Sequence, residues 1–240
     1  MNNILIIGTV DTKADEINFM KECIENLRCH PIIMDVSVLG EPSIKVDFTK
    51  HDIAKYADMT NQEIINLGNE NDAMIASAKG AKKLTSKLCS ENKIDGVIAL
   101  GGTMGTDLAL DVFSDLPLGF PKCLLSTVAG SPLIEPKRLP SDIITMLWAG
   151  GLYGLNSICK SSLSQACGAI VGSTMSPNKI SLAEKSMDAM RTFALISFAI
   201  LKKPDFHSVT FDLVPSGAIA KSVPGLFFIF LTIFKTTSPG

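Results

Sequence analysis

The sequence lacks a concentration of charge of either sign. Its 240 residues include 22 basic and 24 acidic side chains, which are mixed along the chain and give a net charge of −2. Proteins that bind nucleic acid usually carry a basic stripe, and proteins that bind anionic membranes carry a polybasic patch. We therefore expect neither nucleic acid nor a membrane as a partner.

Paired metal ligands are missing as well. The chain has six cysteines without a C-x-x-C pair and three histidines that lie far apart in the sequence. This is not the spacing of a structural zinc site. Free, mostly buried thiols in a reducing cytosol are the expected state, and this predicts a cytoplasmic protein.

No histidine lies near a candidate nucleophile. We expect His30 to precede a strand that starts at Pro31, His51 to lie in a polar loop, and His207 to lie in the C-terminal part. Ser-His-Asp chemistry is therefore not indicated. The catalytic residues stay unassigned, and the sequence leaves open whether the protein is an enzyme.

Apolar runs long enough to cross a membrane are also absent. A membrane-spanning helix needs about 20 such residues, and the apolar runs of this sequence are shorter. The N-terminal run, residues 1–8, has no basic n-region and no small-residue cleavage site, so we interpret it as a first buried strand. The late run, residues 225–234, is closely bounded by Lys221 and Pro224. We interpret it as a core strand.

The most informative segment that is present is the glycine-rich hexapeptide GGTMGT at residues 101–106. It follows the apolar run 96–100 and opens an amphipathic stretch, so it predicts a strand-to-helix turn with bare N–H groups that suit a phosphate. It is neither a P-loop nor a complete dinucleotide fingerprint, and a tight turn without a ligand remains the alternative. The candidate phosphate-binding residues are Gly101, Gly102, Thr103, Gly105 and Thr106.

Short apolar strand candidates alternate with helical patterns along the chain. The expected strands are residues 3–8, 31–38, 96–100, 122–128 and 142–148, and the expected helices include residues 16–27 and 61–90. Continuous β-branched runs separated by helices are typical of a parallel sheet that is covered on both faces. We therefore predict an α/β fold with a doubly wound, Rossmann-like parallel sheet.

Ligands in such sheets bind outside the carboxyl ends of the strands. Four of the predicted strand ends are rich in Gly, Ser, Thr and Asp, namely residues 8–13, 35–37, 101–106 and 126–131. A polar crevice that accepts an anion is expected at this edge of the sheet.

Several of these residues have two interpretations. A hydroxyl of the turn at Thr12 is expected to cap the helix, which is worth about 1 kcal/mol without any ligand, and Thr12 is in addition a candidate ligand contact. Lys13 is either a phosphate partner or a solvated lysine at a helix start. Asp35 either accepts from ribose hydroxyls or caps the following turn. Asp11 and Asp35 could also hold Mg²⁺ together with a nucleotide, although their spacing is not unique to such a site.

Four segments in order carry a resemblance: residues 6–13, 35–42, 95–106 and 125–129. Together they resemble the ATP-binding domain family of the tomato mosaic virus resistance protein and its microbial relatives, over roughly residues 3–175. The resemblance implies two Rossmann-like lobes, ATP held largely by the first, and a tendency to form a homodimer. By position it puts the nucleotide contacts on the hexapeptide and on Asp11, Thr12, Lys13, Ser126 and Thr127.

The sequence departs from this family at three places. Met104 stands where the family usually has glycine, and a positive φ at this position would be costly. Gly151 stands where an aspartate is usual, so a ligand-facing carboxylate would be missing. A second lobe shorter than the family's is expected, and the predicted domains are residues 1–176, a nucleotide-binding lobe, and residues 177–240, an incomplete second α/β lobe.

Two functions follow from these observations. The first is an ATP-binding protein that uses the hexapeptide as a phosphate cradle. The second is a degenerate, non-catalytic paralogue that acts as a protein-interaction module.

Overall fold

A computed structural model describes residues 1–150, 154–175, 210–214 and 228–232 of the chain. The chain divides into two compact units, Met1–Lys179 and Ile180–Gly240. The first unit contains the five-stranded sheet, the helices of the described residues and the candidate site. Each unit is described by itself below.

The first unit is built on one sheet of five parallel strands, in the order β2-β1-β3-β4-β5. The first connection runs from β1 to β2 in one direction, and the later strands are added on the other side of β1. The topology therefore switches between β1 and β3, as in other doubly wound sheets. The predicted α/β fold with a parallel sheet is confirmed. The strands are β1 (Asn3–Gly8), β2 (His30–Asp35), β3 (Gly96–Gly101), β4 (Lys122–Ser126) and β5 (Ile143–Leu147).

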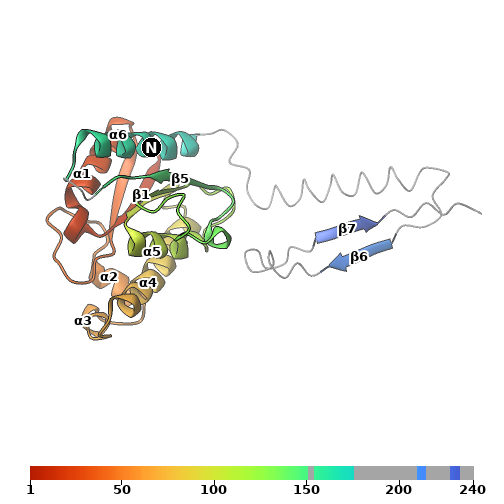
Figure 1. The fold of residues 1–240 in the computed structure, drawn as a ribbon, viewed down its shortest axis with the longest axis horizontal. Coiled ribbons are helices and arrows are strands. Elements are labelled where there is room, and N and C mark those ends of the chain that lie inside the picture. Colours follow the sequence, from red (N-terminus) through yellow and green to blue (C-terminus); the bar gives the residue numbers. More distant parts are fainter. Residues whose placement is uncertain (151–153, 176–209, 215–227, 233–240) are drawn as a thin grey trace, which may run out of the picture. The chain divides into compact units, whose positions relative to one another are not determined.

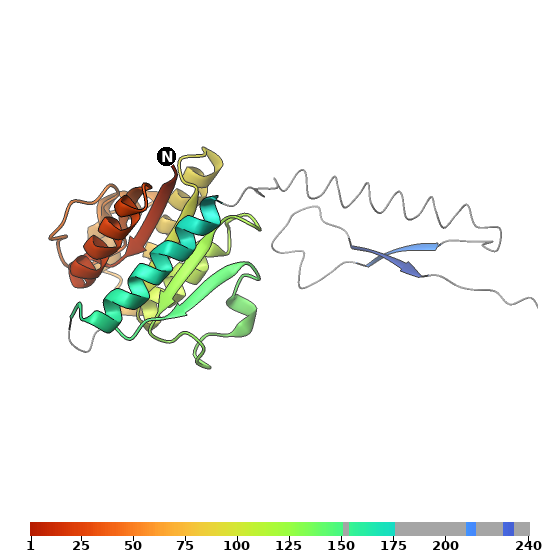
Figure 2. The same ribbon diagram turned by 90° about the horizontal axis from the view of Figure 1, so that it is seen from above.

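Helices cover both faces of this sheet. The side chains of β1 alternate, so that Ile4 and Ile6 pack toward α1 and α6 on one face, while Leu5 and Ile7 pack toward α2, α4 and α5 on the other. Figure 2 shows α1 and α6 side by side over the first face. The helices are α1 (Val10–Asn26), α2 (Lys50–Tyr56), α3 (Asn61–Ile65), α4 (Glu70–Ser90), α5 (Thr103–Phe113) and α6 (Ser157–Met175).

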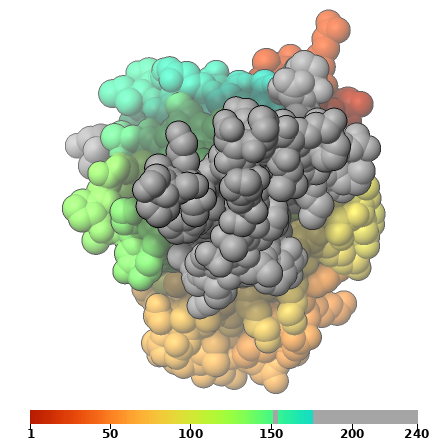
Figure 3. Space-filling model, turned by 90° about the vertical axis from the view of Figure 1, so that its right-hand side faces the viewer, coloured from red at the N-terminus to blue at the C-terminus, as the bar shows by residue number. Residues whose placement is uncertain are grey.

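The short helices α2 and α3 lie against α4 (Figure 1). A small apolar cluster joins the three helices through Ala54, Ile64, Ala73 and Ala76. In the space-filling view of Figure 3, the orange region of α2 and α3 lies at the bottom of the first unit, and the surface of α6 lies at the top. The insertion between β2 and α4 therefore extends the face opposite to α6.

The structure corrects two expectations about helices. The tract 61–90 is not one helix, because Gly68 adopts a φ of +81° and separates α3 from α4. His51 does not lie in a polar loop but in α2, which begins with a capping box between Thr49 and Asp52. The Thr-x-x-Asp spacing was the local signal for this helix.

The two edges of the sheet differ. The outer edge of β2 is covered by a short bridge, in which the Asp35 N–H donates to Phe48 O over 2.9 Å and the Phe48 N–H donates to Ile33 O over 3.0 Å. Among the described residues, β5 pairs with β4 alone. The connection from β4 to β5 contains only the short 3₁₀ helix η1 (Pro136–Arg138), which Arg138 joins to α5 through ion pairs with Asp107 and Asp111.

In the second unit the structure describes two strands, β6 (Thr210–Val214) and β7 (Phe228–Thr232). They pair in antiparallel register, with Thr210 opposite Thr232. The apolar run 225–234 thus contains a strand. The rest of the expected partial lobe lies outside the described residues.

All six cysteines are free thiols, as expected, and four of them are buried. No helix in the described ranges combines the length and the hydropathy that crossing a bilayer requires.

Candidate functional site

Four segments at the carboxyl edge of the sheet, together with the end of α3, surround a cavity of about 560 Å³. They are the first turn of α1, the segment after β2, the N-terminal half of α4 and the first turns of α5. The cavity lies at the switch between β1 and β3, where ligands bind in sheets of this kind. It is lined by Thr9, Asp11, Thr12, residues 36–39, Ile65, residues 68–70, Ala73, Met74, Ser77, Met104, Gly105 and Leu108.

A hydrogen-bond network around Asp35 fixes one side of the cavity. The side chain of Asp35 is fully buried, and its Oδ1 accepts from the N–H of Val10 (3.1 Å), the N–H of Ser37 (3.0 Å) and the hydroxyl of Ser37 (2.5 Å). Ser37 Oγ also lies 3.0 Å from Asp11 Oδ1 and accepts from the Asp11 N–H over 3.2 Å. Two carboxylates therefore share one hydroxyl, and this fixes the first turn of α1 to the end of β2.

Asp35 itself does not line the cavity. Its Oδ1 closes the turn at Ser37 and occupies the first N–H of α1, while its buried Oδ2 has no hydrogen-bond partner among the described residues. The structure thus gives Asp35 the turn-closing contact that the sequence allowed. A contact between Asp35 and a ribose stays a prediction.

The first turn of α1 differs from the expected one. The helix begins at Val10 with Thr9 as N-cap, and no side-chain capping hydrogen bond forms at this residue. The prediction that a hydroxyl of this turn caps the helix is therefore wrong, because Asp35 and Ser37 take the first N–H groups instead. Thr9 Oγ1 and Thr12 Oγ1 lie 3.0 Å apart, and both residues line the cavity.

Lys13 is placed away from the cavity. Its backbone is not helical (φ −129°, ψ 24°), which kinks α1 directly after Thr12. The ammonium group lies 5.4 Å from the ring centroid of Trp148, a fully buried residue that follows β5. This is a cation–π distance. Lys13 is therefore held by Trp148 and is not among the residues that line the cavity.

The hexapeptide forms the predicted turn from β3 to α5. A Cβ on Gly101 would lie 2.6 Å from the carbonyl carbon of Gly105, so only glycine fits under the first helical turn. Gly102 is the N-cap of α5, and the nearest atom to a Cβ placed there is Thr127 Oγ1 at 3.9 Å. The Gly102 position is therefore open.

No side chain caps the N-terminus of α5. The first hydrogen bond of this helix joins the Thr106 N–H to Gly102 O (2.8 Å), so the N–H groups before Thr106 have no partner within the helix. Met104 and Gly105 line the cavity at this point. Uncapped N–H groups thus lie beside the cavity at the first turn of α5.

Met104 does not strain the turn. It lies in the first turn of α5, and it is not among the described residues with positive φ. The cost that a positive φ would have imposed at this position does not arise. Met104 is 39% exposed and lines the cavity beside Gly105. The other departure, Gly151, lies outside the described residues.

Two of the candidate hydroxyls bond to each other inside the protein. Thr106 Oγ1 and Ser126 Oγ lie 2.6 Å apart, and both side chains are buried. Ser126 Oγ also accepts from the Val128 N–H over 3.1 Å. The Thr127 N–H donates to Gly101 O over 3.2 Å, which joins the ends of β3 and β4. These contacts hold the edge of the sheet together.

The structure thus brings only some of the candidate residues to the cavity. Asp11, Thr12 and Gly105 line it, whereas Thr103 and Gly102 flank it in the same turn as Gly105. The wall that α4 contributes was not predicted from the sequence. The signal for this wall was the N-cap Asn69 with Asp72 three residues later, which marks a helix that starts at the carboxyl edge.

The charge of the cavity is acidic. Asp11 and Glu70 line it, and no lysine or arginine is among the lining residues. An anionic ligand would therefore depend on N–H groups, hydroxyls and an accompanying cation rather than on a basic side chain. No group of three metal-binding side chains occurs in the part of the chain that the structure describes.

Comparisons with known proteins show the family of this chain. Residues 2–179 match the family described as uncharacterised protein family UPF0261, N-terminal domain. A UPF0261 protein of Brucella suis is 46% identical over 212 residues, which are 88% of this chain and 50% of that protein. A UPF0261 protein of Clostridium tetani is 31% identical over 169 residues, 70% of this chain and 42% of that protein.

A plant protein is similar at lower identity. The ToMV resistance protein Tm-1 of Solanum lycopersicum is 28% identical over 236 residues, which are 89% of this chain and 30% of that protein. The resemblance inferred from the four sequence segments is thereby confirmed. The chain spans about half the length of the Brucella relative, since the match covers 50% of it. Because the family match covers most of the chain and nearly all of the first unit, the chain belongs to the UPF0261 family.

Proposed function

We propose that the protein binds ATP in the cavity at the carboxyl edge of its sheet. The observation that carries the proposal is the first turn of α5, where uncapped N–H groups meet a cavity of about 560 Å³ at the topological switch point. Helix N-termini of this kind favour phosphate groups through their free N–H donors and the helix dipole. The phosphates would bind at Gly102, Thr103, Met104 and Gly105.

The rest of the cavity suits a nucleoside. Val36, Val38, Ile65, Met74 and Leu108 give it an apolar wall on which a purine could pack. Small-molecule sites commonly combine such a wall with a few polar groups that fix orientation. Here the polar groups are the hydroxyls of Thr9 and Thr12, which would contact the phosphates or the ribose.

Mg²⁺ would enter with the nucleotide. A triphosphate carries several negative charges, and no cationic side chain lines the cavity to balance them. Mg²⁺ is commonly bound by one or two carboxylates together with substrate phosphates. Asp11 lines the cavity and is the carboxylate proposed to contact the ion, whereas Asp35 is buried and already engaged.

Calorimetric titration of the purified chain with ATP and Mg²⁺ tests this proposal, with ADP and GTP as comparisons. The matched control is Gly102→Val, because the open position predicts a small stability cost and direct obstruction of the N–H groups. We expect saturable binding by the wild type and none by the folded variant. Equal affinity in the two proteins would remove the hexapeptide from the site.

A second candidate function is a protein-interaction module that has kept the fold and lost the ligand. Two observations favour it: no basic side chain lines the cavity, and the bulky Met104 lines the cavity beside Gly105. The Met104→Gly variant separates the two functions. A higher nucleotide affinity in the variant than in the wild type would indicate a decayed site. Tight binding by the wild type, with the same affinity in the variant, would support ATP binding.

The proposal includes a compartment and an assembly. Six free thiols suit a reducing environment, and we place the protein in the cytoplasm. The family resemblance suggests a homodimer, which light scattering of the purified chain would detect.

A further inference from the structure

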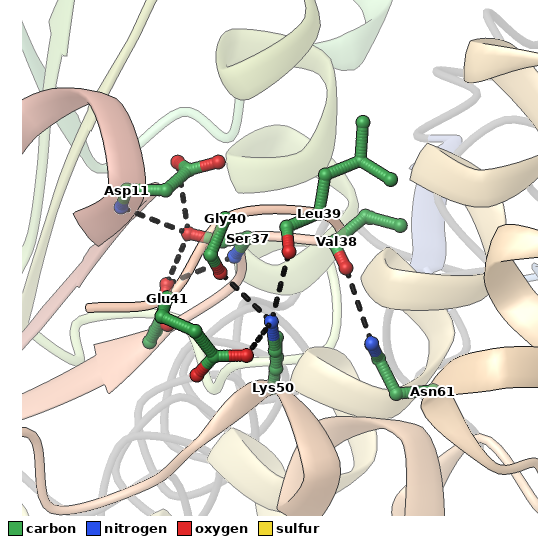
Figure 4. A network of polar contacts seen from close by, with 9 residues as sticks. Asp11, Ser37, Val38, Leu39, Gly40, Glu41, Lys50 and Asn61 are labelled. Carbon is green, nitrogen blue, oxygen red and sulfur yellow. Dashed lines mark hydrogen bonds and ion pairs between the residues drawn. The ribbon is translucent and has the colours of Figure 1, made fainter.

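We propose that Lys50 and Asn61 are positioning residues that hold one wall of the cavity in place for its ligand. The wall is the segment after β2, residues 38–41, of which Val38 and Leu39 line the cavity. Figure 4 shows both side chains pointing at this segment from α2 and α3. The inference rests on the proposed nucleotide function for its ligand, but the contacts that carry it are independent of any ligand.

Lys50 is a buried cation with a full set of acceptors. Its side chain is only 4% exposed, and Nζ donates to Leu39 O (3.0 Å), Gly40 O (2.8 Å) and Glu41 Oε1 (2.8 Å). Burying an ammonium group is costly unless its donors are paired. Three donors meet three acceptors on consecutive residues, so the ammonium fixes the course of the backbone there.

Asn61 adds a fourth contact from a second helix. Its amide group donates to Val38 O over 3.1 Å, and the side chain is 8% exposed. The wall is therefore held at each of its four residues by a side chain from the insertion between β2 and α4.

The local sequence explains why these two side chains are well placed. Lys50 and Asn61 are each the first residue of their helix, directly after the capping threonines Thr49 and Thr60. In both helices the threonine hydroxyl and the acidic residue at N3 form a complete capping box. A fixed helix start sets the direction of the side chain that follows it.

The wall in turn contacts the polar side of the cavity. A Cβ on Gly40 would lie 2.5 Å from Asp11 Cβ, so the wall approaches Asp11 as closely as glycine allows. Ser37, which precedes the wall, lies 3.0 Å from Asp11 Oδ1 through its hydroxyl. A displacement of residues 38–41 would therefore move both the apolar wall and the carboxylate proposed to meet Mg²⁺.

The experiment compares Lys50→Met with Lys79→Met. Lys79 is the control: it also donates to a backbone carbonyl, Ala57 O at 3.2 Å, and pairs with a carboxylate, Asp58 Oδ2 at 3.5 Å, but its side chain is exposed and it is not among the residues that line the cavity. Chymotrypsin cleavage after Leu39, which is 72% exposed, reports on the wall in the ligand-free protein. Calorimetric titration with ATP and Mg²⁺ reports on the site.

We expect Lys50→Met to be cleaved after Leu39 at least about tenfold faster than wild type, since local opening of the wall becomes easier. We expect its ATP affinity to fall roughly tenfold, as is common when a supporting contact is removed. Lys79→Met should match wild type within about twofold in both measurements. Asn61→Ala should give smaller changes in the same direction, and it serves if Lys50→Met does not fold.

Cleavage and affinity that match wild type in both Lys50→Met and Asn61→Ala would overturn the inference. Faster cleavage with unchanged affinity would also overturn it, because the wall would then be held for reasons unrelated to the ligand. If the wild type does not bind ATP, the proposed function fails. Cleavage after Leu39 alone then decides whether Lys50 and Asn61 position the wall.

Discussion

The carboxyl edge of the sheet has two halves that use the same residue types for different purposes. At the ends of β1 and β2, the residues Thr9, Asp11 and Thr12 line a cavity. At the ends of β4 and β5, the hydroxyl of Ser126 is buried against Thr106, and Trp148 is buried in the apolar cluster on the face of α1 and α6. We refer to these as the hollow half and the filled half.

The difference between the halves comes from what packs above each strand end. In the hollow half, α4 and the segment after β2 stand apart and leave a space between them, so hydroxyls remain available to a ligand. In the filled half, the backbone N–H of Trp148 donates to Ser126 O over 3.0 Å, and this hydrogen bond joins the chain after β5 to the end of β4. A polar strand end is therefore a site only where the covering elements leave room.

The largest contrast is expected from truncation of one large side chain in each half. Trp148→Ala should lower the free energy of unfolding by about 3–5 kcal/mol, because a fully buried aromatic side chain leaves a cavity. Met104→Ala in the hollow half should change it by less than about 0.5 kcal/mol. Urea denaturation followed by circular dichroism measures both. Similar losses in the two variants would show that the hollow half is packed.

The next effect concerns the two glycines at the boundary between the halves. Gly101→Ala should cost about 1–3 kcal/mol, because its Cβ would lie within 2.6–2.9 Å of backbone atoms of Gly105 and Thr106. Gly102→Ala has open space and should cost only a few tenths of a kcal/mol. Thermal unfolding of the two variants compares them directly. An equal cost would place Gly102 against packed atoms rather than at an open position.

A smaller effect is expected from the hydroxyl groups. Thr106→Val should lower stability by roughly 1–2 kcal/mol, because it removes a buried partner of Ser126. Thr9→Val, whose hydroxyl contacts only that of Thr12 among the described residues, should stay within about 0.5 kcal/mol. Guanidinium titration checks the pair. Thr9→Val should instead weaken ATP binding. A large loss of stability in Thr9→Val would contradict the distinction between the hollow half and the filled half.

The smallest effect tests how well water is excluded from the core below the filled half. Burial raises the pKa of the Cys123 thiol on β4 to about 12. The unfolded chain loses this proton near pH 9 while the folded chain keeps it, so stability should fall as pH rises between these values, by about 1 kcal/mol at pH 10. Cys123→Ala should show a shallower loss of stability above pH 9. Parallel pH profiles for the variant and the wild type would mean that this thiol does not contribute.

Much of the fold could be predicted from the sequence because its signals are local. The runs at residues 3–8 and 96–100 are continuous and apolar, which indicates strands buried on both faces. The glycine hexapeptide marked the turn into α5. The break at Gly68 was not predicted, because the helical pattern of apolar residues continues across it. The helix that starts after Thr49 was not predicted either, because its only local signal is a capping box.

The candidate site was harder to predict, because cavity and core positions share the same polar residues. Thr12 and Ser126 both follow strands and both carry hydroxyls, yet one lines the cavity and the other is buried. Lys13 was a candidate for phosphate, and its contact with Trp148 joins residues 135 positions apart in the sequence. No local pattern encodes such a contact.

The parallel sheet, the position of the glycine turn and the membership in a family with this arrangement of motifs could be derived from the order of the amino acids alone. These depend on periodicity and on backbone conformations that only certain residues adopt. The tertiary structure decided which polar strand ends meet the cavity, that Asp35 holds α1, and that Lys50 and Asn61 hold the cavity wall. Each of these is a contact between elements that are distant along the chain, and whether such a group faces solvent depends on how the elements pack.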